Sequence, residues 1–341
     1  DTCAPELEKH RDLMLVAGMR SIARSRLLAG GITTIDELAT HHGKIDGVHE
    51  RTLAGLREQA GIQLRQERSG EPEFALPSPE TLSAIPAPDD GDIFFDFEGD
   101  PLWTEDGSTD WGLEYLFGVV EGTADRFTFK PFWAHDRAQE RTALIDFLDY
   151  VTQRRRQYPN MHVYHYAAYE KSALLRLAGR HGVGEDVVDN LLRDNVLVDL
   201  YPVVRGALRI GERSYSIKKL EPLYMGEHNR GGDVTNAAAS VVAYADYCAL
   251  RDDDKHDAAD ELLQGIADYN EYDCESTLLL RNWLLERAFE HSVTPRSGGQ
   301  ESLAVAEPPS PTEDSLREFA FGTEGTADDR RAAALLAAAV G

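Results

Sequence analysis

The sequence predicts an α/β protein in which helices flank a mixed five-stranded sheet, with a small all-α module at the N-terminal end. Three observations lead to this fold class. The first 70 residues show helical apolar spacing and turns but no strand pattern. Three apolar and aromatic runs follow between residues 92 and 133, which is typical of a strand meander. Helical segments then alternate with two further short strands, an order that favours a mixed sheet covered by helices.

The N-terminal module is expected to hold short helices over residues 1–70. Residues 13–28 have helical apolar spacing, and a double-glycine turn leads to a helix start at which Thr34 and Glu37 supply capping groups. A second helix is expected over 50–59. Short helices around a glycine-containing hairpin resemble helix-hairpin-helix modules, which bind nucleic-acid backbone at a helix N-terminus. A helical spacer without a ligand is the alternative interpretation.

Two breaks in composition divide the chain. Residues 71–91 contain five prolines and little periodicity, which predicts an extended linker, and residues 292–315 are expected to form a second linker. The sequence therefore predicts the helical module at 1–70, a central domain at 92–291, and the start of a truncated following region at 316–341. Because the chain begins with Asp and ends in an apolar segment, we expect it to be a piece of a longer protein.

The net charge of −25, from 60 acidic and 35 basic residues, argues at first against a nucleic-acid binder, since phosphate contacts favour a basic surface. The excess lies after residue 70, because the first 70 residues carry ten acidic and ten basic side chains. No apolar run approaches the roughly 18 residues of a membrane span, and the start lacks a signal-peptide pattern. Three cysteines cannot form a disulfide framework and favour a cytoplasmic location.

The central domain is expected to alternate strands and helices after an initial meander. The expected elements, in order, are strands at 92–97, 115–120 and 127–133, a helix at 138–150, a strand at 161–166, a helix at 171–180, a strand at 196–200, and mostly helical sequence up to residue 291.

The first candidate site segment is the strand end Phe94-Phe95-Asp96-Phe97-Glu98. Asp96 and Glu98 lie two apart on a strand and therefore point to one face, while Phe95 and Phe97 point to the other. Two carboxylates on one face of a buried strand are costly unless they meet a cation, and Mg²⁺ and Mn²⁺ prefer such oxygen ligands. The alternative is a strand that runs out into solvent.

Two further candidate segments lie in predicted helices. Tyr269 and Asp273 are four apart in a strongly helical stretch, so they share one face, although a surface Asp and a half-buried Tyr would fit the same pattern. An apolar strand at 163–166 delivers Glu170 to the start of a helix, where the helix dipole favours negative charge. By itself, Glu170 is interpreted as a helix cap.

Taken in order, these three segments resemble the DEDD exonuclease superfamily, tyrosine subtype, which has an RNase H-like fold. The resemblance covers about residues 92–290. Within the superfamily, the chain is most similar to predicted exonuclease domains that are related to the proofreading domain of family B polymerases. Such domains occur in large bacterial proteins beside a RecB-like nuclease region and a superfamily 1 helicase. The resemblance implies a 3′–5′ exonuclease acting on single-stranded DNA or RNA, monomeric and without a membrane partner, with nuclease and helicase regions in the same longer chain.

The resemblance also implies a role for each candidate residue. Two Mg²⁺ or Mn²⁺ ions, roughly 4 Å apart, would be held by carboxylates. Asp96 would bridge both ions and Glu98 would hold the first. Glu170 and Asp273 would complete the ligand set. Tyr269 would orient the attacking water through its hydroxyl group, which can donate and accept without ionising.

Lys218 and Lys219 are candidate phosphate contacts, with solvated lysines on a helix as the alternative. One position departs from the family pattern, because Glu170 stands where the family has Asp, and His165 or Tyr166 stands near the usual Asn. This departure bears on the second metal position. Three hypotheses follow: a metal-dependent exonuclease, a degenerate domain that binds nucleic acid or a partner without cleavage, and a structural connector.

Overall fold

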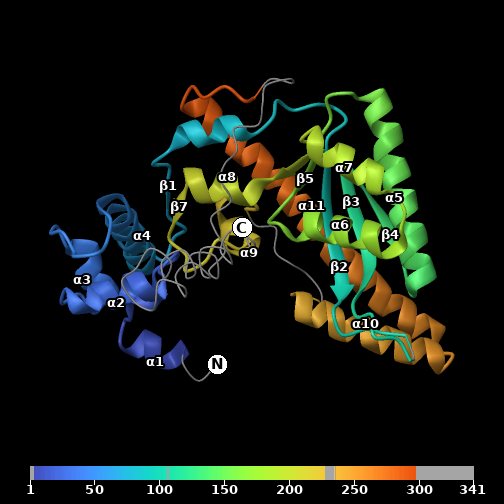
Figure 1. Cartoon of the computed structure of the whole chain (residues 1–341), viewed down its shortest axis with the longest axis horizontal. Coiled ribbons are helices and arrows are strands. Elements are labelled where there is room, and N and C mark those ends of the chain that lie inside the picture. Colours follow the sequence, from blue (N-terminus) through green and yellow to red (C-terminus); the bar gives the residue numbers. More distant parts are fainter. Residues whose placement is uncertain (1–3, 106, 227–233, 235, 297–341) are drawn as a thin grey trace, which may run out of the picture. The chain divides into compact units, whose positions relative to one another are not determined.

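The computed structural model describes residues 4–105, 107–226, 234 and 236–296, and these form two compact units (Figure 1). The helical unit contains the residues up to Pro77 together with Leu208–Tyr215. The sheet unit contains Ser78–Ala207 and the described residues from Ser216 onward. Residues 297–315 of the predicted second linker at 292–315, and the whole following region at 316–341, lie outside the described residues.

The helical unit is built from short helices and one two-stranded ladder. Its elements are α1 (Ala4–Lys9), the 3-10 helix η1 (Leu13–Leu15), α2 (Ser21–Ala29), α3 (Ile35–Thr40), α4 (Glu50–Ser69), and β1 (Phe74–Ala75) paired antiparallel with β7 (Arg209–Ile210). The continuous helical spacing of residues 13–28 is interrupted in the structure, because Gly18 adopts a left-handed φ of 82° between η1 and α2. The predicted helix start at Thr34 is confirmed, since Thr34 and Glu37 form a reciprocal capping box on α3.

The long helix α4 organises the helical unit. The helix extends ten residues beyond the predicted 50–59 and ends at Gly70, which takes the left-handed conformation of a helix C-terminus. Its buried apolar residues form one cluster with apolar side chains of η1, α2, α3 and the segments between them. Its buried Gln59 donates to the Ile210 carbonyl at 2.8 Å and accepts from the Tyr215 hydroxyl at 2.7 Å, so α4 is joined to the segment that carries β7.

The sheet unit contains the predicted mixed five-stranded sheet, in the order β4-β3-β2-β5-β6. Its strands are β2 (Ile93–Asp100), β3 (Leu113–Thr123), β4 (Arg126–Trp133), β5 (Val163–His165) and β6 (Leu197–Asp199). β2, β3 and β4 form an antiparallel meander, while β5 and β6 continue the sheet in parallel from β2. β2 is therefore the central strand, and it joins the antiparallel part to the parallel part.

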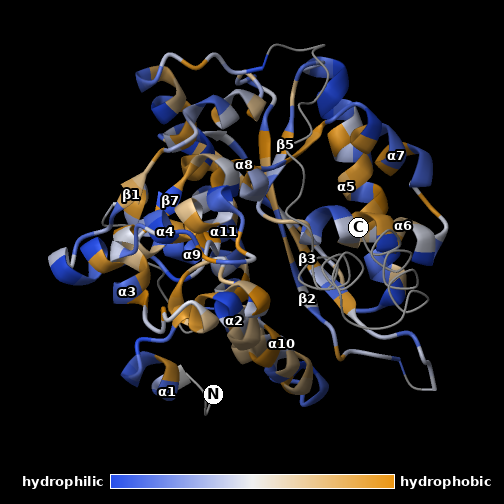
Figure 2. Cartoon of the chain, turned by 60° about the vertical axis from the view of Figure 1, so that its left-hand side comes forward, coloured by the Kyte–Doolittle hydropathy of each residue, from blue (hydrophilic) through white to orange (hydrophobic). Residues whose placement is uncertain are grey.

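Helices cover both faces of this sheet (Figure 1). The helices of the sheet unit are α5 (Arg137–Gln157), α6 (Tyr169–His181), α7 (Glu185–Arg193), α8 (Leu200–Ala207), α9 (Ile217–Leu220), α10 (Ala237–Asp252) and α11 (His256–Glu290), with 3-10 turns η2 (Pro79–Ala84) and η3 (Glu221–Leu223). Figure 2 shows hydrophobic and hydrophilic residues interspersed along α5, and the buried residues of this helix include Leu144, Phe147 and Val151. α11 crosses β2, β3 and β5 on the face opposite to α5 and α6.

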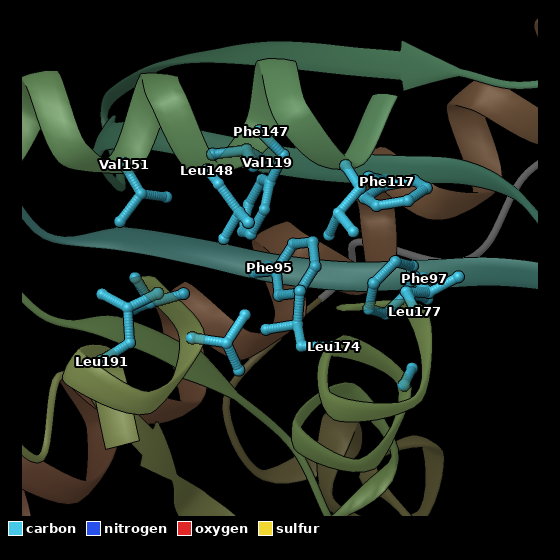
Figure 3. Packing of buried hydrophobic residues seen from close by; sticks show 14 of the residues in the cluster. Phe95, Phe97, Phe117, Val119, Phe147, Leu148, Val151, Leu174, Leu177 and Leu191 are labelled. Carbon is cyan, nitrogen blue, oxygen red and sulfur yellow. The ribbon is translucent and has the colours of Figure 1, made fainter. Parts of the chain in front are cut away.

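The main core lies between the sheet and helices α5, α6 and α7 (Figure 3). Phe95 of β2 stacks on Phe147 of α5 with ring centroids 4.4 Å apart, and Phe97 meets Phe117 edge to face at 4.6 Å. Aromatic pairs of this kind stabilise a core beyond the area that they bury. Because side chains alternate along a strand, these contacts commit the neighbouring even-numbered residues of β2 to the α11 face.

A β-bulge interrupts the pairing of β2 with β3. Glu98 pairs with Leu116 but Gly99 pairs with Glu114, so Tyr115 is the extra residue of β3. The bulge reverses the alternation of β3 at this point. Tyr115 consequently packs on the α10 side, while Glu114 faces α6, where it accepts from the Tyr169 hydroxyl at 2.7 Å.

Residues 71–91, expected as an extended linker, carry both β1 and η2. Leu82 and Ile85 are fully buried, and Pro79 lies in the first turn of η2, a position that suits proline. None of the described helices is long and apolar enough to cross a membrane.

A buried ion pair fixes α11 to the sheet. Arg281 of α11 donates to the Asp92 carboxylate at 2.7 Å, and its guanidinium lies 4.9 Å from the ring centroids of both Phe94 and Tyr164. Asp92 also accepts from the His162 amide at 2.9 Å. Both charged side chains are almost completely buried, so neither can be solvated if its partner is removed.

We predict that Arg281→Met destabilises the protein by about 3–5 kcal/mol, because it leaves the Asp92 charge buried and unpaired. Chemical denaturation measures this change. Arg287→Met on the same helix is the matched control, since Arg287 pairs with the exposed Glu290 and its loss should cost about 1 kcal/mol or less. Equal losses in the two variants would contradict the prediction.

Candidate metal centre

The sheet presents two acidic side chains toward α11. Asp96 and Glu98 of β2 lie on the face opposite to Phe95 and Phe97, as the alternation of the strand predicts. Glu98 is buried, while Asp96 is half-buried. The strand therefore places both carboxylates under α11, in a position that costs free energy unless they are compensated.

α11 brings a third carboxylate to the same place. One carboxylate oxygen from each of Asp96, Glu98 and Asp273 lies within 4.8 Å of the other two. We call these three residues the acidic trio. The trio joins the predicted strand pair to a residue that is distant in sequence.

The pKa values reflect this crowding. Burial, and then the neighbouring carboxylates with Asp273 first, raise the pKa of Asp96 well above its usual value. Burial likewise raises the pKa of Glu98 from 4.5 to about 8, although hydrogen bonds from Ser240 and Asn270 act in the opposite direction. Charged groups in these positions therefore repel one another, and a cation placed among them would relieve the repulsion.

Glu170 lies beside the trio. It is buried in the first turn of α6, and a hydrogen bond between its carboxyl group and Asp96 contributes to the raised pKa of Asp96. Its Oε2 lies 3.2 Å from His165 Nδ1. Burial lowers the pKa of His165, but the hydrogen bond and charge of Glu170 outweigh this effect and raise it overall. Glu170 is thus shared between Asp96 and a buried imidazole.

The turn between β5 and α6 sets the position of Glu170. Ala167 has a left-handed φ of 76°, which is unfavourable for a residue with a side chain. Its carbonyl accepts from His165 Nδ1 at 2.8 Å and its amide donates to Asp199 at 2.8 Å. Asp199 also accepts from the Tyr201 amide at 2.8 Å, so it orients the start of α8. These bonds hold the turn in its strained conformation.

Tyr269 lies one helical turn before Asp273 and is buried. Lys218 of α9 donates to its hydroxyl at 2.9 Å and lies 5.1 Å from the centroid of its ring. The positive charge of Lys218 also reaches Glu98, whose pKa it lowers. Lys219 is exposed. The structure thus brings Lys218 into the acidic site, while its predicted role as a phosphate contact, like that of Lys219, stays a prediction.

α10 adds a hydrogen-bonded chain behind Glu98. The Tyr115 and Ser240 hydroxyl oxygens lie 2.6 Å apart, and Ser240 bonds to Glu98. Burial raises the pKa of Tyr115, and its protonated hydroxyl can donate to Ser240, although either oxygen of the pair can be the donor. Ser240 can then donate to the Glu98 carboxylate. The bulge at Tyr115 makes this chain possible, because it turns Tyr115 toward α10.

Sequence reasoning missed three residues of this site: Asn270, Ser240 and, as a partner of Glu170, His165. Asn270 adjoins Tyr269 in the recognised helical segment. His165 belongs to the recognised apolar strand, where its polar character was available as a clue. Ser240 lies in an alanine-rich helix far from every motif, and nothing local distinguishes it.

The donor set suits a hard divalent cation. All three ligands of the trio are carboxylate oxygens, which Mg²⁺ and Mn²⁺ prefer, and no thiol or imidazole belongs to the trio. The raised pKa values of Asp96 and Glu98 indicate negative charge that lacks sufficient compensation from the surrounding protein. The residues present therefore fit such an ion.

An antiparallel meander continued by two parallel strands, with acidic side chains on the central strand, defines an α/β domain of the RNase H type. The sequence model of a family described as the RNase H superfamily matches residues 93–285, more than half of the chain, and the chain belongs to that superfamily. Together with the acidic trio, this membership suggests a nuclease-type hydrolase. No curated protein and no solved structure matches the chain.

We predict that, without metal, the free energy of unfolding falls as the pH rises from about 4.5 to about 8. A carboxyl group whose pKa is raised on folding binds its proton more tightly in the folded state, so deprotonation favours unfolding. The slope from Glu98 alone is about 1.4 kcal/mol per pH unit. Denaturation in a chelator should show this slope in the wild type, and Glu98→Gln should reduce it. A variant curve parallel to the wild type would contradict the assignment.

Proposed function

We propose that this protein is a metal-dependent 3′–5′ exonuclease that hydrolyses phosphodiester bonds at single-stranded nucleic-acid ends. The observation that carries the proposal is the convergence of Asp96, Glu98 and Asp273, with Tyr269 one helical turn from Asp273 on the same helix. Membership in the RNase H superfamily supports it. Two bound Mg²⁺ or Mn²⁺ ions would supply Lewis-acid stabilisation of the developing phosphoryl charge.

Each candidate site residue has a defined role in this proposal. The trio and the adjacent Glu170 bind the cations. The Tyr269 hydroxyl orients the attacking water by hydrogen bonding. Because Lys218 donates to the Tyr269 oxygen, the phenolic proton is directed away from Lys218. Lys219 contributes a positive charge at the surface for the phosphate backbone.

The acidity of the chain is compatible with this substrate. Cations bound at the trio reverse the sign of the local charge, so a phosphodiester can approach. The overall charge of −25 still opposes binding of a polyanion at a distance. We therefore propose that the affinity for nucleic acid is modest, and that nuclease and helicase regions of a longer polypeptide supply the rest, as the family resemblance implies.

We predict that the protein shortens a 5′-labelled single-stranded oligonucleotide stepwise from its 3′ end when Mn²⁺ or Mg²⁺ is present. Asp96→Asn and Asp273→Asn should each reduce the rate by at least about 100-fold, since each removes a charge that stabilises the reaction. Asp268→Asn is the matched control, because Asp268 is exposed on the same helix as Asp273 and should leave the rate unchanged.

Two further substrates are tested in the same assay: a circular single strand, which has no 3′ end, and an RNA of the same sequence, which distinguishes DNA from RNA specificity. An exonuclease leaves the circle intact, whereas cleavage of the circle would show endonuclease activity. Degradation that persists in Asp96→Asn and Asp273→Asn would disprove the site assignment.

One observation favours a second candidate function, a degenerate domain that binds nucleic acid or a partner without cleavage. Glu170 lies outside the trio and is engaged by His165 at 3.2 Å, so its carboxylate is partly committed to a protein group. If the domain is degenerate, the protein should bind labelled single strands in the presence of a chelator and yield no cleavage products with any divalent cation.

Substitutions at Glu170 separate the two functions. For the exonuclease we predict that Glu170→Gln lowers the rate by about 10- to 100-fold with little change in oligonucleotide binding, whereas Glu170→Asp keeps a larger share of the activity. For the degenerate domain, neither substitution changes the binding constant and the wild type yields no product. Fluorescence anisotropy and product analysis on the same samples distinguish these results.

A further inference from the structure

Asn270 lies at the centre of the acidic site and is completely buried. Its Nδ2 donates to the Asp96 Oδ2 at 3.0 Å. It also forms a hydrogen bond with Glu98, and this bond opposes the effect of burial on the pKa of that carboxyl group. One side-chain amide thus contacts both strand carboxylates of the trio.

The sheet is shaped to admit this amide. Gly118 of β3 is the direct cross-strand partner of Asp96. A Cβ atom at residue 118 would stand 1.5 Å from Asn270 Oδ1 and 2.7 Å from its Cγ. Gly118 lies between Phe117 and Val119, both fully buried, and a glycine inside a strand normally weakens it. The reason for glycine at this position is therefore the close approach of the Asn270 side chain.

The surroundings also fix which way the amide points. Cys274, one helical turn after Asn270, donates from Sγ to the Gly118 carbonyl at 3.4 Å and lies 4.0 Å from Asn270 Oδ1. The Nδ2 group donates to Asp96, and the bond of Asn270 to Glu98 favours the ionised form of that carboxyl group, so the NH₂ end of the amide faces both side chains. The carbonyl end then faces Gly118 and Cys274, as observed.

From these contacts we propose that Asn270 is a positioning residue, which holds Asp96 and Glu98 in the orientation that receives a divalent cation, and that Gly118 is required to admit it. Like charges two residues apart on one strand face would turn away from each other. A donor between them holds Asp96 Oδ2 and bonds to Glu98, while one carboxylate oxygen of each lies within 4.8 Å of an oxygen of Asp273. The inference rests on the proposed function, since it concerns how that site binds its cation.

The first test uses Asn270→Leu, which keeps the branched shape of the side chain and removes its amide hydrogen bonds. Binding of Mn²⁺ alone, measured by calorimetry and by electron paramagnetic resonance without nucleic acid, should weaken by about 10- to 100-fold. In the cleavage assay kcat should fall, while KM for the oligonucleotide should stay nearly constant. Unchanged Mn²⁺ affinity in a folded Asn270→Leu variant would overturn the proposal.

The second test uses the packing partner. Gly118→Ala should weaken Mn²⁺ binding to a similar extent, although residue 118 offers no ligand, because its methyl group displaces the amide. In Gly118→Ala with Asn270→Ala, the methyl group occupies the space of the missing amide, so thermal stability should recover toward the wild type. Mn²⁺ affinity should remain as low as in the single variants, since all of them lack the same positioned donor.

The double variant separates positioning from packing. Recovery of both stability and Mn²⁺ affinity would show that Asn270 only fills space, and the proposal would be wrong. The wild-type protein distinguishes failure of the positioning role from failure of the proposed exonuclease function. A wild type that binds Mn²⁺ but cleaves nothing ends the exonuclease proposal and leaves the positioning test valid, whereas a wild type that does not bind Mn²⁺ overturns the positioning role.

Discussion

The arrangement of the sheet unit depends on keeping like-charged carboxylates buried together on one face of β2. Phe95 and Phe97 commit the opposite face of this strand to the aromatic core under α5. Asp96 and Glu98 are consequently forced under α11, where water cannot fully solvate them. The burial of the apolar core drives folding. The same core thus also fixes the location of a charge cluster whose burial opposes folding. The remaining features of the site compensate for this conflict.

The compensation comes from elements that are far apart in sequence. α11 contributes an amide donor from Asn270, and α10 contributes a hydroxyl donor from Ser240, while the ammonium group of Lys218 lies close enough to favour the ionised form of Glu98. On the other side of Asp96, a strained turn places Glu170 against His165. α11 itself is held by the buried pair of Arg281 and Asp92 at the opposite end of β2. Two hydrogen-bond donors and one ammonium group, each from a different helix, therefore act on the carboxylates of β2.

Local patterns were sufficient to predict the strands, their two faces and the sharing of one helical face by Tyr269 and Asp273, because each depends on a fixed period of two or 3.6 residues. The mixed sheet followed from the order of the elements. Local patterns could not show that Tyr115 is an extra residue in β3, since a bulge depends on pairing between strands. For the same reason Asn270, Ser240 and the closeness of Lys218 to Tyr269 escaped prediction: each depends on tertiary contacts between separate elements.

The bulge at Tyr115 makes chain length, as well as residue identity, a determinant of this site. One additional residue in β3 separates Gly118, which faces Asn270, from Glu114, which faces α6. Removing any single residue between them would restore regular alternation and rotate every side chain on one side of the gap to the other face. Substitutions in this stretch alter one contact at a time, whereas a deletion would turn either Gly118 away from Asn270 or Glu114 away from α6. In related sequences, length at this position should therefore vary less than residue type.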